Sequence, residues 1–229
     1  MTGYAITGSF CTHKKSIEML RILVHRKLDI VPILSDSVYN FDTRFGTAND
    51  LIDTVEKITG NKAVHTICEA EKFGPEIPLD ALIIAPCTGN TLAKMANGIT
   101  DTPVCMAAKA HMRQTRPLLI ALASNDAMAA NLTNIATMLN KKNVFFVPLM
   151  QDDPSSKPHS LVCDFSRLTE SYDKMLLGKQ CRPLFIKKNS NLYGCCFYYL
   201  SKPSRFIIFS NTSISPEISM ASSRNNASN

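Results

Sequence analysis

The feature that most constrains the fold of this 229-residue chain is an alternation between short, almost wholly apolar runs and segments with helical spacing. The apolar runs predict strands at residues 3–7, 29–35, 63–67, 79–86, 117–123 and 144–148. Helical segments follow at 17–27, 49–60, 88–97, 102–112, 126–140 and 160–177. Strands without polar alternation are typical of a parallel sheet that helices bury on both faces. We therefore expect an α/β fold with a doubly wound parallel sheet, a Rossmann-like or flavodoxin-like three-layer sandwich.

The composition changes near residue 187, which predicts a boundary. Between residues 187 and 229, Asn and Ser supply 16 of 43 residues, and no strand or helix period extends beyond short patches. Such a composition is typical of a disordered or weakly structured segment. We expect an α/β domain over residues 1–186 and an atypical tail over 187–229, either a functional module or a foreign extension, and assign the tail no function.

Charge, cysteine spacing and hydropathy exclude several classes of protein. The formal net charge is +6, but the tail holds +4 of it, so the body has no basic face for nucleic acid. The eight cysteines form no C-x-x-C pair, which predicts reduced, mostly buried thiols and no metal site. No charged leader and no apolar run of about 20 residues is present. We expect a cytoplasmic protein without a membrane segment.

Ligands of such sheets bind beyond the carboxyl ends of the strands, so the strand exits are the places to search. Gly8 and Ser9 follow the first predicted strand, and Ser35 and Ser37 follow the second. A small residue, hydroxyl groups and a helix start suit a phosphate. The pattern is neither G-x-G-x-x-G nor a P-loop, which disfavours a standard dinucleotide or a nucleoside triphosphate. The alternative is a capped turn and a polar loop without any ligand.

The third exit, "IIAPCTGNT" at residues 83–91, carries the most specific pattern. Pro86 ends the strand and Thr88 can cap the next helix. Gly89 allows a flat group to approach, and Asn90 can present donors and an acceptor to the edge of a heterocycle. A capped helix start without a ligand would look similar.

"APCTGNTLAKMANGITD" (85–101) resembles the P-A-S-A-N-T signature of the homo-oligomeric flavin-containing cysteine decarboxylase family, and "LASNDAM" (122–128) keeps half of its P-x-M-N-x-x-M motif. The resemblance covers residues 3–180 and implies FMN as cofactor and a trimer-based homo-oligomer. The residues that it implies for the cofactor are Gly8, Ser9, Ser35, Ser37, Pro86, Thr88, Asn90, Thr91, Asn125 and Met128.

Two further segments, at 106–135 and 141–162, are similar to the dipicolinate synthase branch of that family. This resemblance implies a flavoprotein-like subunit that takes part in oxidising a dihydro or hydroxy-tetrahydro precursor to pyridine-2,6-dicarboxylate during sporulation. It also implies a partner, the A subunit of dipicolinate synthase, which is expected to bring a nicotinamide-nucleotide domain.

Departures from the decarboxylase pattern argue against a decarboxylase. Decarboxylating members carry a His shortly before the signature strand, whereas His65 lies 21 residues before Pro86 in a different predicted strand. Leu122 and Ser124 replace the Pro and the first Met of the P-x-M-N motif. Two alternatives stay open: another FMN enzyme of the family, either a cysteine-type decarboxylase or a flavin prenyltransferase, and a non-catalytic structural or regulatory subunit.

The segment "KAHMRQTR" contains the candidates for binding a dicarboxylate substrate. Lys109, Arg113 and Arg116 lie close together in the chain, and Arg can hold a carboxylate through two parallel hydrogen bonds. The alternative is a solvated, charged helix end. For the catalytic step we expect Asn90 to orient the flavin or the substrate, with His111 as the candidate acid or base.

Overall fold

The computed structural model describes residues 1–74 and 76–187, which belong to one compact unit, Met1–Asn189. The strands are β1 (Thr2–Ile6), β2 (Ile30–Leu34), β3 (Ala81–Cys87), β4 (Leu118–Ser124), β5 (Val144–Phe146), β6 (Leu149–Gln151), β7 (Leu161–Cys163) and β8 (Phe185–Ile186). The α-helices are α1 (His13–His25), α2 (Asp36–Asn40), α3 (Ala48–Thr59), α4 (Ile67–Glu71), α5 (Gly89–Ala96), α6 (Pro103–Met112), α7 (Leu132–Leu139) and α8 (Leu168–Leu176). Two 3₁₀ turns, Phe10–Thr12 and Phe165–Arg167, precede α1 and α8.

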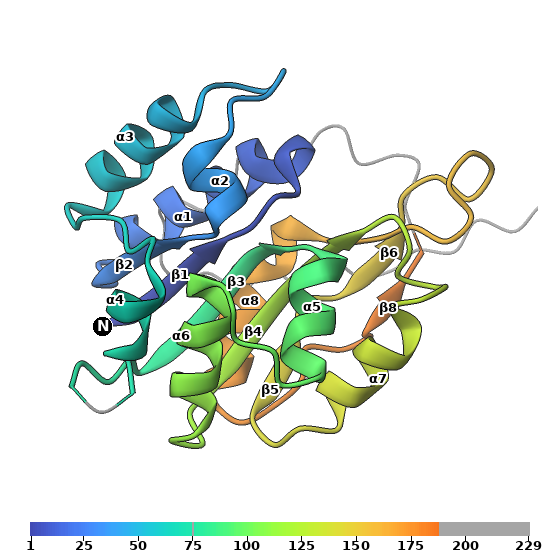
Figure 1. The fold of residues 1–229 in the computed structure, drawn as a ribbon. Helices are drawn as coiled ribbons and strands as arrows, with labels where there is room; N and C mark the ends of the chain where they lie inside the picture. The colour runs from blue at the N-terminus through green and yellow to red at the C-terminus, as the bar shows by residue number, and fades with distance from the viewer. Residues whose placement is uncertain (75, 188–229) are drawn as a thin grey trace, which may run out of the picture. The chain divides into compact units, whose positions relative to one another are not determined.

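All eight strands join one sheet. Its order is β2-β1-β3-β4-β7-β6-β8, and β5 pairs with β4 beside this path (Figure 1). The strands β1 to β5 are parallel, while β7 runs antiparallel to the last residues of β4 and to β6. The expected parallel α/β sheet is therefore confirmed, with a short antiparallel extension that the sequence did not predict.

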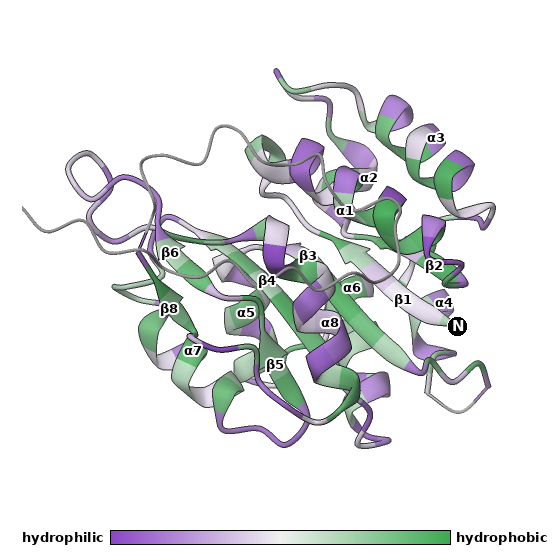
Figure 2. Ribbon diagram, turned by 180° about the vertical axis from the view of Figure 1, so that it is seen from behind, coloured by the Kyte–Doolittle hydropathy of each residue, from purple (hydrophilic) through white to green (hydrophobic). Residues whose placement is uncertain are grey.

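Helices cover both faces of the sheet. The helices α4 to α7 pack together on one face, whereas α1 packs on β3 and on α8 at the other. Figure 2, drawn from behind, shows α8 lying across the central strands. β1 to β5 are buried along their whole length, except for the half-buried last residue of β4. This double burial explains why these strands lack polar alternation.

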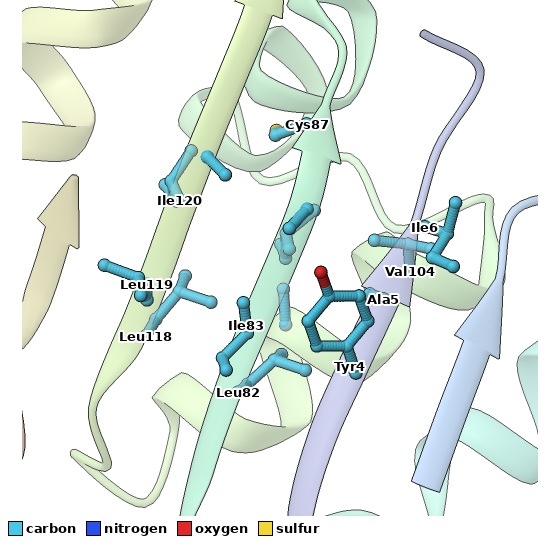
Figure 3. Close-up of a cluster of buried hydrophobic side chains, with 14 of the residues drawn as sticks. Tyr4, Ala5, Ile6, Leu82, Ile83, Cys87, Val104, Leu118, Leu119 and Ile120 are labelled. Atoms are coloured by element: carbon cyan, nitrogen blue, oxygen red, sulfur yellow. The ribbon is translucent and has the colours of Figure 1, made fainter. Parts of the chain in front are cut away.

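The centre of the core is built from β1, β3 and β4. Tyr4, paired in register with Ile83, is fully buried, and Figure 3 shows both side chains beside Leu82. The Tyr4 hydroxyl donates to the carbonyl oxygen of Ser16 at 2.8 Å, which satisfies the one polar group of this buried ring. β1 and α1 are thereby fixed to each other.

Three predicted elements were wrong in type or extent. Residues 63–67 form only an isolated bridge at Val64 and then the start of α4, because Thr66 and Glu69 make a capping box that begins a helix. The helix expected over 126–140 begins at Leu132, after a series of turns. The helix expected from residue 160 begins only at Leu168, and β7 occupies its first part.

The loop expected after β2 contains a helix, α2, and β8 was not predicted at all. Six cysteines lie in the described residues and all are free: Cys87, Cys105, Cys163 and Cys181 are buried, and Cys11 and Cys68 are exposed. The predicted tail lies, apart from Lys187, outside the described residues. Over the residues described, no helix combines the length and the apolarity needed to cross a bilayer.

Candidate functional site

The residues expected to bind the cofactor follow four adjacent parallel strands, β2, β1, β3 and β4. Because parallel strands end at the same edge of a sheet, their exits converge there (Figure 1). The residues that lie at this edge are Gly8, Ser9, Ser35, Ser37, Pro86, Thr88, Asn90, Thr91, Asn125 and Met128. We call it the carboxyl edge.

The first two exits meet directly. A Cβ atom placed on Gly8 would lie 3.0 Å from Ser37 Oγ, so only a residue without a side chain fits here without displacing that hydroxyl. Ser37 Oγ lies 3.1 Å from Ser35 Oγ, and Ser35 is buried. The hydroxyl groups that follow β2 therefore lie beside the turn that follows β1.

The turn after β1 also exposes backbone donors. Within residues 1–74 and 76–187, the amide N–H groups of Gly8, Phe10 and Cys11 have no acceptor, and the Ser9 hydroxyl makes no capping bond. Successive unpaired N–H groups at the start of a helical segment form an anion-binding concavity. With the serine hydroxyls nearby, the donor set suits the phosphate of a nucleotide.

Thr7 joins the first exit to the third, a role that the sequence analysis missed. Its N–H and its hydroxyl both donate to the carbonyl oxygen of Pro86, at 3.2 and 2.8 Å, and its Oγ1 accepts the N–H of Thr88 at 2.9 Å. Thr7 thereby continues the contact between β1 and β3 beyond the last residue pair of their ladder, Ala5 with Ile84. The sequence signal that could have revealed this role is a Thr at the end of the first predicted strand.

α5 begins at the third exit as predicted. The Thr88 hydroxyl accepts the N–H of Thr91 at 3.2 Å and lies 3.0 Å from the Thr91 hydroxyl, which makes Thr88 the N-cap. Asn90 is exposed, and its carboxamide has no hydrogen-bond partner in the described part of the chain. It is free to bind a ligand at the positive end of α5.

Gly89 has a different role from the one expected. Rather than leaving room for a flat ligand, it is buried against the residues that follow β4. A Cβ on Gly89 would overlap Ser124 Oγ, and it would lie 2.6 Å from Asn131 Nδ2 and 2.9 Å from Asp126 Oδ1. The sequence analysis missed Asp126 and Asn131, although polar residues directly after a buried strand were a signal.

Asp126 is the centre of this polar cluster. Ser124 donates to one carboxylate oxygen, and Asn131 Nδ2 donates to the other at 2.8 Å. Asn134 Nδ2 donates in turn to Asn131 Oδ1 at 2.9 Å, which extends the cluster along α7. The carboxylate lies beside the first residue of α5, where the helix dipole favours a negative charge. The cluster therefore holds α5 against the fourth exit.

The two residues kept from the P-x-M-N-x-x-M motif lie in the turns after β4. Asn125 is exposed and Met128 half-buried, and the Met128 N–H donates to the carbonyl oxygen of His159 at 2.9 Å. Asn125 and Met128 therefore lie at the carboxyl edge, but no hydrogen bond among the described residues connects them to Asn90.

A cavity of about 820 Å³ opens beside the first exit, between α1 and α3, with Phe10, His13 and Val38 in its lining. His13 is buried, and its Nε2 donates to the carbonyl oxygen of Thr7 at 2.8 Å. Burial lowers the pKa of His13 and thus favours the neutral ring. Asn90 does not line this cavity, so the cavity adjoins the end of the site near Ser9.

The residues expected to bind substrate lie at the opposite edge of the sheet, at the amino ends of the strands. Lys109 lies on α6, and Arg113 and Arg116 follow it in the turn that leads into the amino end of β4. Lys109 and Arg113 are exposed, whereas Arg116 Nη1 donates to the carbonyl oxygen of Leu79 at 2.6 Å. Within one chain, the structure does not bring these cations to the carboxyl edge.

His111 is likewise at the amino end of β4. It is fully buried, and its Nε2 donates to the carbonyl oxygen of Pro117 at 2.9 Å. Its Nδ1 is buried without a partner among the described residues, and burial lowers the pKa of the ring. The expected acid or base role at the flavin site therefore has no geometric support within one chain.

The carboxyl edge fits the chemistry of FMN. The free amides and hydroxyls at the first two exits match a phosphate, and Asn90 can bind the edge of a ring that lies beside α5. Over the described ranges, no three His, Cys, Asp or Glu side chains are grouped as metal ligands would be.

Comparisons with known proteins identify the family of the chain. A family model described as Flavoprotein matches residues 2–173. The B subunit of dipicolinate synthase from Bacillus subtilis (strain 168) is 38% identical over 185 residues, which cover 81% of this chain and 92% of that protein. The crystal structure of the dipicolinate synthase B subunit from Bacillus halodurans C is also 38% identical, with a TM-score of 0.76, and the match covers 82% of this chain and 96% of that one.

More distant structures share the fold. The FMN-dependent cysteine decarboxylase SpaF is 19% identical with a TM-score of 0.57, and the match covers 77% of this chain and 95% of that one. The predicted resemblance, both to the flavin family and to its dipicolinate synthase branch, is confirmed. The chain belongs to the Flavoprotein family.

Proposed function

We propose that this protein is the flavin-binding subunit of a dipicolinate synthase and takes part in forming pyridine-2,6-dicarboxylate. The observation that carries the proposal is its similarity to the B subunit of that synthase, 38% identical over 92% of the length of the Bacillus subtilis protein. The free donors of the carboxyl edge support the flavin part of it. A role in sporulation, which the family resemblance implies, and a cytoplasmic location, which the sequence analysis predicts, both belong to the proposal.

Each part of the carboxyl edge has a defined task in this proposal. The amides of Gly8 and Phe10, with the hydroxyls of Ser9 and Ser37, bind the phosphate of FMN. Asn90 orients the flavin ring or the substrate from the first turn of α5. The cap at Thr88 and the bonds of Thr7 hold that turn in place.

The proposed reaction converts a dihydrodipicolinate to the aromatic dicarboxylate by removing two hydrogens, one as hydride and one as a proton. FMN supplies the hydride acceptor when bound. The protein positions the ring and shields it from water. We propose that the A subunit of the synthase joins this chain in the complete enzyme, and that copies of this chain assemble as a trimer-based homo-oligomer.

The experiment that tests the proposal is the visible absorption of the purified chain after dialysis with and then without excess FMN. We expect wild type to retain the flavin band, and the double variant Ser9→Ala, Asn90→Ala to lose it, because both carry unpaired polar groups at the site. Ser155→Ala with Asn140→Ala removes an exposed hydroxyl and an exposed carboxamide elsewhere and should keep the band.

A second measurement separates the proposed synthase from its alternatives. A flavin-loaded chain mixed with the synthase's A subunit should form pyridine-2,6-dicarboxylate and leave peptidyl and pantothenoyl cysteine unchanged. Release of CO₂ from a cysteine substrate would instead make the chain a decarboxylase. A wild-type protein that never retains a flavin band would contradict the cofactor and favour a structural or regulatory subunit.

A further inference from the structure

A second candidate site lies away from the carboxyl edge. A hollow of about 390 Å³ opens between the end of α5, the last turns of α6 and the turn before β5, elements on the near face in Figure 1. Lys109 lines it from α6 and Arg113 from the turn that follows α6, and Lys141 and Lys142 line it from the turn after α7. We call it the basic hollow.

The lining of the basic hollow carries an excess of positive charge, although Glu71 lines a neighbouring hollow together with Lys109 and Arg113. No acidic side chain is among the residues that line the basic hollow. None of its four cations forms an ion pair or a side-chain hydrogen bond within the described residues. The carboxyl ends of α5, α6 and α7 lie here, and three helix ends together supply about one and a half negative charges. Helix capping therefore accounts for only a fraction of the four positive charges.

The wall of the hollow is apolar in part. Met95 and Cys105 are buried residues that line it, and the half-buried Met112 lines it as well. A hollow of this volume lies within the range of small-molecule sites. Cations around apolar surface suit an organic anion whose body contacts the thioethers while its carboxylates meet the cations.

Two hydrogen bonds join the turns at the rim of the basic hollow. Asn143 Nδ2 donates to the carbonyl oxygen of Thr115, and Leu118 N donates to the carbonyl oxygen of Asn143 at 2.9 Å. Thr115 and Asn143 have φ angles of 54° and 62°. A left-handed conformation is unusual for a β-branched residue and costs free energy, so such outliers point to a functional constraint. The two turns that carry Arg113 and Lys142 are thus tied together.

We propose that the basic hollow binds a small dicarboxylate with a flat, apolar body, at a site separate from the carboxyl edge. One carboxylate would meet Lys109 and Arg113, and the other would meet Lys141 and Lys142. The ring would contact the Met and Cys side chains of the lining. A nucleic acid is a poor match, because the hollow has a volume of only about 390 Å³ and its four cations are too few to follow a phosphate backbone. The inference goes beyond the proposed function, since it requires neither FMN nor catalysis.

Calorimetric titration of the full-length chain, free of FMN, with pyridine-2,6-dicarboxylate tests the proposal. We expect one saturable site on wild type and at least about tenfold weaker binding by the double variant Lys141→Gln, Lys142→Gln, because two charge-assisted contacts are lost. Both lysines are exposed, so the fold should tolerate the change. Lys57→Gln with Lys179→Gln removes two exposed charges elsewhere and should bind as wild type does.

Further probes separate a dicarboxylate site from a general attraction for anions. Pyridine-2-carboxylate, with one carboxylate, should bind more weakly, and inorganic phosphate should compete poorly because it has no apolar body. Absence of saturable binding, unchanged binding by the Lys141, Lys142 variant, or equal competition by phosphate would each overturn the proposal. The flavin band tests the carboxyl edge separately, so the two proposals can fail independently.

Discussion

Gly89 and Asn90 are neighbours with opposite surroundings. Asn90 is exposed and has no partner in the described part of the chain, whereas Gly89 is enclosed by the polar cluster around Asp126. Since a Cβ on Gly89 would overlap Ser124 Oγ, we predict that Gly89→Ala lowers the free energy of unfolding by about 1–3 kcal/mol. Urea denaturation measures the change.

A second variant identifies the cause. Ser124→Gly removes the hydroxyl nearest to the added methyl group, so the double variant Gly89→Ala, Ser124→Gly should lose less stability than the sum of the two single variants. Additive effects would show that the polar cluster does not limit the size of residue 89.

Because His13 and His111 are buried, we predict that the folded protein loses stability in acid. Burial lowers the pKa of both His13 and His111 below the ordinary value of 6.5. The unfolded chain then binds protons more readily than the folded one, so stability falls as the pH drops below about 6.5, by up to about 1.4 kcal/mol per pH unit for each ring. Unfolding free energies measured across this range should fall less steeply for His13→Gln than for wild type. Equal slopes would mean that His13 titrates alike in both states.

The elements that the sequence predicted well are those buried on both faces. β1 to β4 are apolar runs of five to seven residues, a length and composition typical of strands that are buried on both faces. The errors lie where local and tertiary signals compete. "AVHTI" has strand-forming residues, but the Thr66–Glu69 capping box starts α4. β7 pairs with β4 through Val162 and Leu161, a long-range contact that helical spacing alone does not reveal.

The start of α8 depends on an exposed ionic cluster. Glu170 accepts hydrogen bonds from Arg167 and Lys174, at 3.0 and 2.6 Å, and these partners lower its pKa to about 2. Arg167 also donates to the carbonyl oxygen of Arg182 at 3.1 Å, which connects α8 to the segment before β8.

Because folding lowers the pKa of Glu170, its stabilisation is present above the ordinary value of 4.5 and is lost as the pH falls toward 2. We predict that Glu170→Gln costs less than about 1 kcal/mol near neutral pH, since solvent screens an exposed cluster. The difference from wild type should vanish in acid and shrink in high salt. A difference that persists in acid would point to packing instead of charge.

On the scale of the whole molecule, sequence reasoning placed the residues expected to bind a cofactor at one edge of the sheet but did not place the cations. Four strand exits converge because the strands are parallel, which their apolar character predicted. "KAHMRQTR" precedes a strand, and the end of a helix that leads into a parallel strand lies at the amino end of that strand. That topology was available from the sequence, whereas the contact of Thr115 with Asn143 was not, because it joins turns 28 residues apart.

The folded domain includes the last strand, β8, which lets us predict where the domain ends. β8 pairs in parallel with β6, and the N–H of Leu149 donates to the carbonyl oxygen of Leu184 at 2.7 Å, so the sheet includes the chain up to Ile186. We predict that a chain ending at Lys187 unfolds at the same urea concentration as the full chain and retains FMN equally. A chain ending at Lys179 would lose β8 and the bonds of Gln180 with Phe146, and should unfold at lower urea. If the chain ending at Lys187 is itself clearly less stable than the full chain, residues beyond 187 contribute to the folded domain and the boundary lies further along the chain.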